Sequence, residues 1–222
     1  MPGENQVEPE GTDTAPALPQ LIELKRKPEL GERFVDALAY AARVHAGQRK
    51  KSDGQPYIGH LLRVTGMVIE DGSSENEAIA ALLHDTAEDQ GGLSRLAEIG
   101  RRYGEAVATI VNECTDTYLP EKPSWRERKE HYVEHLGDSS SGALRVSLAD
   151  KLDNARTALR DYAVQGEGLW SRSPASSEDL RWYYTALARR FAELQPGPLA
   201  AQLTRAAQEL DRLLGSDENR RS

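Results

Sequence analysis

The amino-acid sequence predicts an all-α protein, a bundle of about eight to ten helices. Ala and Leu together account for 53 of the 222 residues, and Val and Ile for only 16. Ala and Leu favour helices, whereas β-branched residues favour strands. Apolar residues recur mostly at helical spacing, and no segment alternates with the period of a strand. The hydrophobic fraction of 38% is low for a globular protein but sufficient for one core.

The two ends of the chain differ in composition from the part between them. Residues 1–18 are rich in Pro, Gly, Glu and Thr, and they carry four acidic residues and no basic one. Such a segment buries too little apolar surface to fold, so we expect an acidic disordered tail. Residues 216–222 have a similar composition, and we expect a second tail there. The sequence therefore predicts one domain over residues 19–215.

The first three helices are defined by their start and stop signals. Apolar residues share one face over residues 30–45, and a polar loop follows. Pro56 then fits the first turn of a helix that runs to about residue 69. Ser74 is a plausible N-cap of the third helix, since Glu77 follows at the spacing of a capping box. This helix is expected to continue to Gly91, where a pair of glycines ends it.

The later helices follow from the same apolar periodicity. Pro196, Gly197 and Pro198 interrupt the chain before the last of them. The predicted ranges are 94–102, 104–114, 123–136, 141–162, 179–194 and 199–214.

Net charge restricts the class of partner. The formal charge of −8 disfavours broad nucleic-acid binding, because an acidic surface repels phosphate backbones. A pocket can still carry its own local charge. Residues 41–63 contain five basic residues and only one acidic residue. The sequence thus allows a small anionic substrate but disfavours a nucleic-acid polymer.

Cysteine content and hydropathy indicate the compartment. Cys114 is the single cysteine, which excludes an internal disulfide and a Cys-based zinc finger and fits a reducing environment. No apolar run approaches the ~18 residues that span a bilayer. The first residues lack the basic and apolar regions of a secretory signal. We therefore expect a cytoplasmic protein with no membrane partner; its oligomeric state is left open.

The strongest chemical signal is His84-Asp85 followed by Glu88-Asp89, directly after an apolar run. His84 is expected to lie over Glu88 and Asp85 over Asp89, because residues four apart on a helix share a face. Four ionisable groups are costly to bury unless something pairs with them, and a divalent cation would do so. The alternative is that the acidic group faces water.

His60 on the preceding helix and Asp150 on a later one favour the metal site. Together with His84 and Asp85 they allow three helices to offer ligands to one ion. Two imidazoles and two carboxylates suit Mn²⁺, Fe²⁺ or Zn²⁺ rather than Ca²⁺. A site of this kind lowers the pKa of bound water and holds phosphate oxygens, as phosphoester hydrolysis requires.

The order His, His-Asp, Asp resembles the HD-domain superfamily of metal-dependent phosphohydrolases. The stretches VHAGQRKKSDGQPYIGH, LLHDTAED and LADKLDNART are similar to three motifs of the guanosine-polyphosphate (alarmone) 3′-pyrophosphohydrolases. This group includes the hydrolase domain of Rel/SpoT enzymes and the stand-alone small alarmone hydrolases. The similarity covers about residues 33–162. It implies an HD-type helical bundle that removes 3′-pyrophosphate from guanosine or adenosine polyphosphates such as ppGpp.

The resemblance also implies roles for individual residues. The metal, usually Mn²⁺ in the family, would be held by His60, His84, Asp85 and Asp150. Glu88 and Asp89 match the acidic pair that orients or activates the attacking water. The expected contacts to the nucleotide polyphosphate come from Arg49, Lys50, Lys51, Asn154 and Arg156.

Three departures from the family pattern leave the base and the substrate open. Asp153 stands where a histidine is usual, Leu61 where a proline is usual, and Lys50 where an arginine is typical. Lysine cannot stack on a base as a guanidinium does. The base could therefore be guanine or adenine, and a different nucleotide substrate, a nucleoside mono- or triphosphate, remains an alternative. A binding module that has lost activity is disfavoured, because all four ligand positions and both acidic residues are present.

Other chemistry-bearing residues are expected to be structural. Tyr57 receives no catalytic role, and His45 is interpreted as a supporting histidine. His131 and His135 have the spacing of a metal pair but adjoin Glu130 and Glu134, so we expect them on a solvent-facing helix.

Overall fold

A computed structural model of the chain describes residues 29–118, 123–166, 168 and 175–221, with side chains described as far as residue 215. The tail predicted over residues 1–18 lies outside the described residues. Within them the all-α prediction is confirmed: they form ten α-helices and one short 3₁₀ helix. Their β-structure consists of one isolated bridge, between Arg49 and Pro56.

Most helices lie close to their predicted ranges. In chain order they are α1 (Glu32–Val44), α2 (Ile58–Glu70), α3 (Glu75–Leu83), α4 (Thr86–Gln90), α5 (Gly92–Tyr103), α6 (Glu105–Cys114), α7 (Trp125–His135), the 3₁₀ helix η1 (Leu136–Asp138), α8 (Ser141–Gln165), α9 (Ser177–Leu194) and α10 (Pro198–Arg221). The predicted capping box at Ser74 and Glu77 is confirmed at the start of α3. The exception is the helix expected from Ser74 to Gly91, which is divided into α3 and α4.

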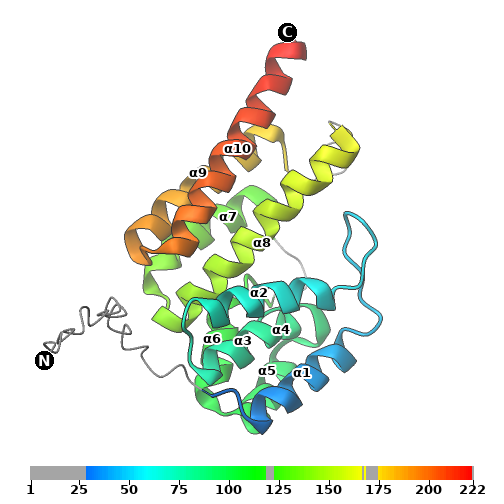
Figure 1. Cartoon of the computed structure of the whole chain (residues 1–222), viewed down its shortest axis with the longest axis vertical. Coiled ribbons are helices and arrows are strands. Elements are labelled where there is room, and N and C mark those ends of the chain that lie inside the picture. The colour runs from blue at the N-terminus through cyan, green and yellow to red at the C-terminus, as the bar shows by residue number, and fades with distance from the viewer. Residues whose placement is uncertain (1–28, 119–122, 167, 169–174, 222) are drawn as a thin grey trace, which may run out of the picture.

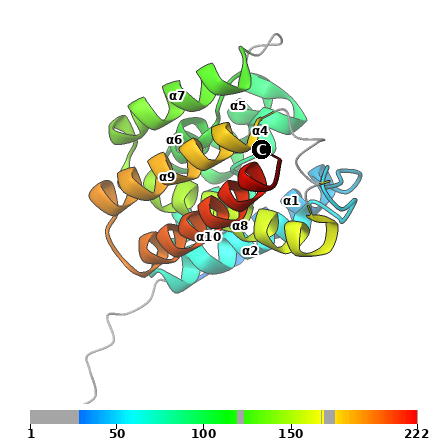
Figure 2. The ribbon, with the colours of Figure 1, turned by 90° about the horizontal axis from the view of Figure 1, so that it is seen from above.

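The helices form two groups that share α8. In Figure 1, α1–α6 occupy the lower half, α7, α9 and α10 lie above, and α8 runs diagonally through both. In Figure 2, α10 lies between α9 and α8. Two buried apolar clusters correspond to these groups. Helix α8 contributes Ala143, Val146 and Ala149 to the first cluster and Leu144, Leu148 and Leu152 to the second.

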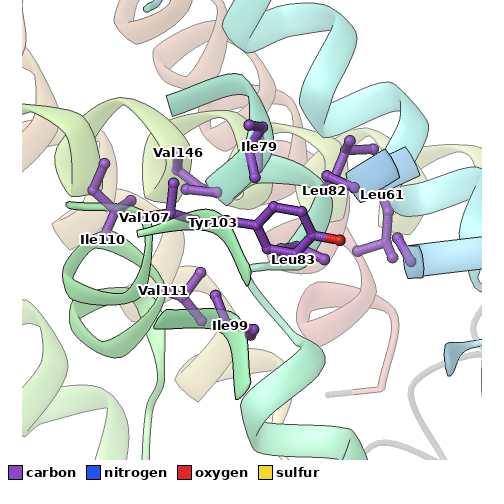
Figure 3. Close-up of a cluster of buried hydrophobic side chains, with 14 of the residues drawn as sticks. Leu61, Ile79, Leu82, Leu83, Ile99, Tyr103, Val107, Ile110, Val111 and Val146 are labelled. Carbon is purple, nitrogen blue, oxygen red and sulfur yellow. The ribbon is translucent and has the colours of Figure 1, made fainter. Parts of the chain in front are cut away.

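The first apolar cluster anchors the segment that carries the chemistry. Leu82 and Leu83 at the end of α3 are fully buried against Leu61 of α2 and Ile99 of α5, as Figure 3 shows. His84 follows directly. Because interior side chains are closely packed, this contact fixes the position of the following residues relative to α2. The apolar core thereby determines where the polar segment begins.

The C-terminal helix extends beyond the predicted end of the domain. Helix α10 reaches Arg221, across residue 216, where the sequence places the start of a tail. The domain boundaries themselves stay a prediction. No helix among the described residues has the length and apolar character needed to cross a membrane.

The shared position of α8 can be tested with Leu148→Ala. The Leu148 side chain is only 1% exposed, so its truncation should lower the free energy of unfolding by about 2–5 kcal/mol, as is usual for buried leucines. Val164→Ala on the same helix is the control, because Val164 is 83% exposed and should change stability by less than about 0.5 kcal/mol. Urea denaturation measures both. Similar losses in the two variants would contradict the arrangement of the second cluster.

Candidate metal centre and active site

The four predicted ligand residues come together at one buried point. His60 lies in the first turn of α2, His84 and Asp85 between α3 and α4, and Asp150 in α8. Asp150 Oδ1 is 3.2 Å from His60 Nε2 and 3.7 Å from His84 Nε2. Asp85 Oδ2 is 3.6 Å and 3.1 Å from the same two nitrogens. Three segments distant in sequence thus direct nitrogen and oxygen atoms to one centre.

The interruption between α3 and α4 corrects the expectation of a continuous helix. Adjacent residues on a regular helix point about 100° apart and do not face each other. Here α3 ends at Leu83 and α4 begins at Thr86. His84 and Asp85 lie in the turn between them, which brings His84 Nε2 and Asp85 Oδ2 within 3.1 Å. The break therefore allows neighbouring residues to serve a single centre.

Hydrogen bonds on the outer side of both imidazoles fix their orientation. His84 Nδ1 donates to the carbonyl oxygen of Ala81 at 2.9 Å, and His60 Nδ1 donates to Asp153 Oδ2 at 2.7 Å. These oxygens can only accept, so each Nδ1 carries the hydrogen and each Nε2 presents a lone pair to the centre when the ring is neutral. Outer partners of this kind are typical of metal-ligating histidines.

Asp153 and Arg63 form a supporting pair that the sequence analysis missed. Arg63 Nε donates to Asp153 Oδ1 at 2.6 Å, and the Asp153 side chain is buried beside His60. These bonds hold the pKa of Asp153 at about 2, although burial opposes ionisation. The residue that departs from the family pattern therefore holds an imidazole in place. The available signal was the spacing of Asp153, three residues after Asp150 on the same helix.

Tyr57 is the second supporting residue that sequence reasoning missed. Its hydroxyl donates to Asp85 Oδ2, the oxygen that faces both imidazoles. Burial, followed by the charge of Asp85, raises the pKa of Tyr57, so the hydroxyl stays protonated and remains a donor. Tyr57 lies three residues before His60 at the start of α2, and this short separation was the signal that could have identified it.

The chemistry of the donor set fits a divalent cation. His84 Nε2 is buried and has no hydrogen-bond partner among the described residues. Burial alone lowers the pKa of both imidazoles, yet the carboxylates of Asp85 and Asp150 raise the pKa of His84 to about 10 and hold that of His60 well above its ordinary value. The centre thus demands positive charge beside its carboxylates. Nitrogen and oxygen donors from His60, His84, Asp85 and Asp150 could hold a cation that meets this demand.

The acidic pair Glu88 and Asp89 lines the same cavity as two of these ligand candidates. The cavity has a volume of about 210 Å³ and its lining includes Asp85 and Asp150. Glu88 Oε2 accepts a hydrogen bond from the backbone N–H of Asp116 at 3.2 Å. Burial and the charge of Asp85 raise the pKa of Asp89. The structure therefore brings a carboxylate with increased basicity close to the His/Asp centre.

A hydrogen-bond network that runs through Gln48 to His45 holds Asp89 in position. Gln48 donates through Nε2 to Asp89 Oδ2 at 2.7 Å. Gln48 Oε1 lies 2.6 Å from Nδ1 of the buried His45, whose Nε2 is 3.1 Å from Thr86 Oγ1. Burial lowers the pKa of His45, which favours its neutral form. His45 therefore has a supporting position, and Gln48 connects it to Asp89.

The structure places the five predicted substrate contacts in different surroundings. Asn154 lines the cavity and donates to Asp150 Oδ1 at 2.7 Å, and Lys50 donates to Thr157 of α8 at 3.1 Å. Arg49 and Lys51 are exposed on the loop before α2. Arg156 lies elsewhere, where it contacts Gln202 of α10 and Met67 Sδ. The roles of all five stay predictions.

The basic residues in the cavity wall are not those that the sequence indicated. Arg128 and Lys129 of α7 and Lys151 of α8 line it together with the acidic pair. Helix α7 carries no recognisable motif, so only the fold reveals that it closes this cavity. His131 and His135, on the same helix, are exposed as expected.

The fold and the site define a metal-dependent phosphohydrolase of the HD type. The family model described as "HD domain" matches residues 37–172, and the chain belongs to this family. Its relatives include guanosine-3′,5′-bis(diphosphate) 3′-pyrophosphohydrolases named MESH1. The Drosophila melanogaster protein is 34% identical over 143 residues, which is 63% of this chain and 75% of the relative. The Homo sapiens protein is 39% identical over 131 residues, 58% of this chain and 70% of the relative.

Solved structures agree with this assignment. A metazoan ortholog of SpoT that hydrolyzes ppGpp is similar with a TM-score of 0.65 and 28% identity, covering 81% of this chain and 96% of that one. The protein lmo0812 from Listeria monocytogenes is similar with a TM-score of 0.60 and 26% identity, covering 69% of this chain and 99% of that one. The resemblance found in the three sequence motifs is thereby confirmed.

Cation binding at the centre can be tested with His84→Ala. Mn²⁺ is a suitable probe, and the wild-type chain should bind one ion. The variant should lose this binding, because it removes a buried nitrogen donor. The control is His135→Ala, which removes an exposed imidazole on α7. Calorimetric titration measures both. A His84→Ala variant that binds Mn²⁺ as well as the control would contradict the proposed centre.

Because Asp153 only supports His60, its substitution should weaken Mn²⁺ binding less than the loss of His84 does. Asp153→Ala removes the partner of His60 Nδ1, so Mn²⁺ affinity should fall by about 10–100-fold. Asp161→Ala is a matched control, since Asp161 is a buried acid on the same helix that pairs with Arg160. Equal affinities in the two variants would show that Asp153 does not orient the imidazole.

Proposed function

We propose that the chain is a hydrolase that removes the 3′-pyrophosphate of guanosine-3′,5′-bis(diphosphate) with Mn²⁺ as its resident ion. The observation that carries the proposal is one cavity bounded by Asp85 and Asp150 of the His/Asp centre and by Glu88 and Asp89. A cation site and a neighbouring general base are the two parts that hydrolysis of a phosphoester requires. The names of the relatives indicate the substrate.

His60, His84, Asp85 and Asp150 would hold the ion. When bound, the ion supplies Lewis-acid polarisation of a phosphate oxygen and lowers the pKa of water. The protein keeps these donors oriented through three contacts of its own: Asp153 on His60, the Ala81 carbonyl on His84, and Tyr57 on Asp85. Donors fixed in advance need not reorganise when the ion binds.

Asp89 and Glu88 would handle the proton of the attacking water. The oxygen of water forms a bond to the phosphorus that is attached to the 3′ oxygen, and the bond between this phosphorus and the 3′ oxygen breaks. Asp89 takes up a proton from the water. The 3′ oxygen leaves with the bonding electron pair and is protonated by solvent water, which gives the 3′ hydroxyl. The raised pKa of Asp89 makes it a stronger base than an ordinary carboxylate. The hydrogen bond from Gln48 keeps Asp89 Oδ2 in place.

Asn154 and Lys50 would help to position the nucleotide. Asn154 lies next to Asp150 and lines the cavity. Lys50 joins the loop before α2 to Thr157 of α8. The exposed Arg49 and Lys51 are free of the core and could approach phosphates from the same loop. The single cysteine and the small nucleotide substrate both fit a cytoplasmic enzyme.

The direct test is release of pyrophosphate from ppGpp. The Mn²⁺-loaded protein should convert ppGpp to pyrophosphate and GDP, and chelation of the ion should stop the reaction. Asp85→Asn should lower the rate by more than about 100-fold, because a neutral amide is a poor ligand. Asp138→Asn, at an exposed position, is the control. If the metal-loaded protein leaves both ppGpp and ppApp intact, the proposal fails.

The role of Gln48 predicts a change in pH dependence. Gln48→Met removes the N–H that stabilises ionised Asp89, so the pKa of Asp89 should rise. The base must be deprotonated to act, and activity is lost as pH falls through its pKa. The acidic limb of the pH–rate profile should therefore move to higher pH. Gln90→Met is the control, because Gln90 contacts Gln48 but makes no hydrogen bond to Asp89. Superimposable profiles would exclude this role.

A further inference from the structure

The cavity beside the His/Asp centre has a cationic end that the proposed reaction does not use. We define the lysine end of the cavity as Arg128, Lys129 and Tyr132 of α7 together with Lys151 of α8; all four line the cavity. Lys151 lies in the motif LADKLDNART, but none of the four was assigned a role from the sequence. The same lining also carries five carboxylates, so the three cations form a positive end within an otherwise acidic cavity.

Two of these cations share one counter-ion. Asp116 accepts a hydrogen bond from Arg128 and another from Lys129 Nζ at 3.1 Å. One carboxylate cannot neutralise both charges, so an excess of positive charge remains. The Lys129 side chain is only 16% exposed. Burial lowers the pKa of Lys129, and the charge of Lys151 lowers it further. An anion bound at this end would stabilise both lysines.

Tyr132 supplies a buried hydroxyl whose hydrogen-bonding capacity is not satisfied by good geometry among the described residues. Its hydroxyl is buried beside the Ser147 side chain, and among the described residues it makes no hydrogen bond within the usual distance and angle limits. The centroid of its ring lies 4.9 Å from Lys151 Nζ and 5.9 Å from Lys129 Nζ. A buried hydroxyl without a partner is destabilising unless a ligand satisfies it. An oxyanion between the two ammonium groups would accept from all three.

The lysine end lies next to the His/Asp centre. Lys151 Nζ is 2.6 Å from Asp150 Oδ2, and Asp150 Oδ1 is 3.2 Å from His60 Nε2. A single carboxylate group therefore separates the two ends. The two phosphates of a pyrophosphate group are likewise separated by a single bridging oxygen. This short separation fits a compact ligand with two adjacent anionic centres.

We propose that Lys129, Lys151 and Tyr132 form a subsite for the outer phosphate of a pyrophosphate group whose inner phosphate lies at the His/Asp centre. The inference rests on the proposed function, since it assigns the second phosphate of the 3′-diphosphate to a defined place. Arg128 holds Asp116 and so positions Lys129. The subsite selects for a 3′-diphosphate over a 3′-monophosphate, because only the former reaches the lysine end.

The test compares the binding of inorganic pyrophosphate and inorganic phosphate to the Mn²⁺-loaded full chain by calorimetry. Lys129→Met removes one ammonium group and should weaken pyrophosphate binding about tenfold or more, whereas phosphate binding should change less than about twofold. Tyr132→Phe keeps the ring and deletes the hydroxyl, and it should weaken pyrophosphate several-fold. Neither residue contacts a ligand candidate, so the Mn²⁺ stoichiometry of both variants should equal that of the wild type.

Arg126→Met is the matched control. Arg126 lies on the same helix but pairs with Glu130 and Asp179 and stacks on Trp182, away from the cavity. The Arg126→Met variant should bind phosphate and pyrophosphate with the same affinities as the wild type. Unchanged pyrophosphate binding in Lys129→Met and Tyr132→Phe would overturn the subsite. Equal weakening of phosphate and pyrophosphate binding would also overturn the subsite, because such a result would reflect only the loss of positive charge near the centre.

The result is separable from the proposed function. If Lys129→Met loses pyrophosphate binding while the wild-type chain leaves ppGpp intact, the subsite stands and the substrate assignment fails. If ppGpp is hydrolysed but pyrophosphate binding does not depend on Lys129, the hydrolase stands and the subsite fails.

Discussion

The structure depends on the meeting of two buried imidazoles with the carboxylates of Asp85 and Asp150 at one point. His60, His84 and Asp150 are each at most 6% exposed, and Asp85 meets them from the turn between α3 and α4. Such a group is costly in an apolar interior unless its charges are compensated. A bound cation would compensate the charge of the two carboxylates, and it requires imidazole nitrogens that are held in a fixed orientation. The hydrogen bonds of Asp153 and the Ala81 carbonyl meet this requirement, and the hydrogen bond of Tyr57 holds Asp85.

Helix α8 connects this centre to the rest of the fold. One of its faces packs on the cluster that fixes α2 and α3, and the other packs on α10. Asp150 therefore has its position set by both cores. The same helix carries Asp153 and Asn154 beside the centre and Lys151 toward α7. A displacement of α8 would change ligand geometry, imidazole orientation and the lysine end together, which explains why one long helix carries so many of the polar contacts.

The sequence predicted the helices and the four ligand candidates, because helical periodicity is local and three motifs resemble a known family. It failed at the turn between Leu83 and Thr86, because apolar periodicity does not reveal a local interruption within a helical segment. It also missed the contact between Asp153 and His60, which joins residues 93 positions apart. The cations of α7 could not be foreseen, since their relation to the cavity arises only from tertiary packing.

In the proposed enzyme, His60, His84, Asp85 and Asp150 hold one divalent cation beside Asp89. A crystal structure of the Mn²⁺-loaded protein, with anomalous scattering recorded at the manganese edge, tests this arrangement most directly. A single anomalous peak should lie within coordination distance of both Nε2 atoms and of one oxygen from each aspartate. A peak located elsewhere, or coordination that omits the imidazoles, would contradict it.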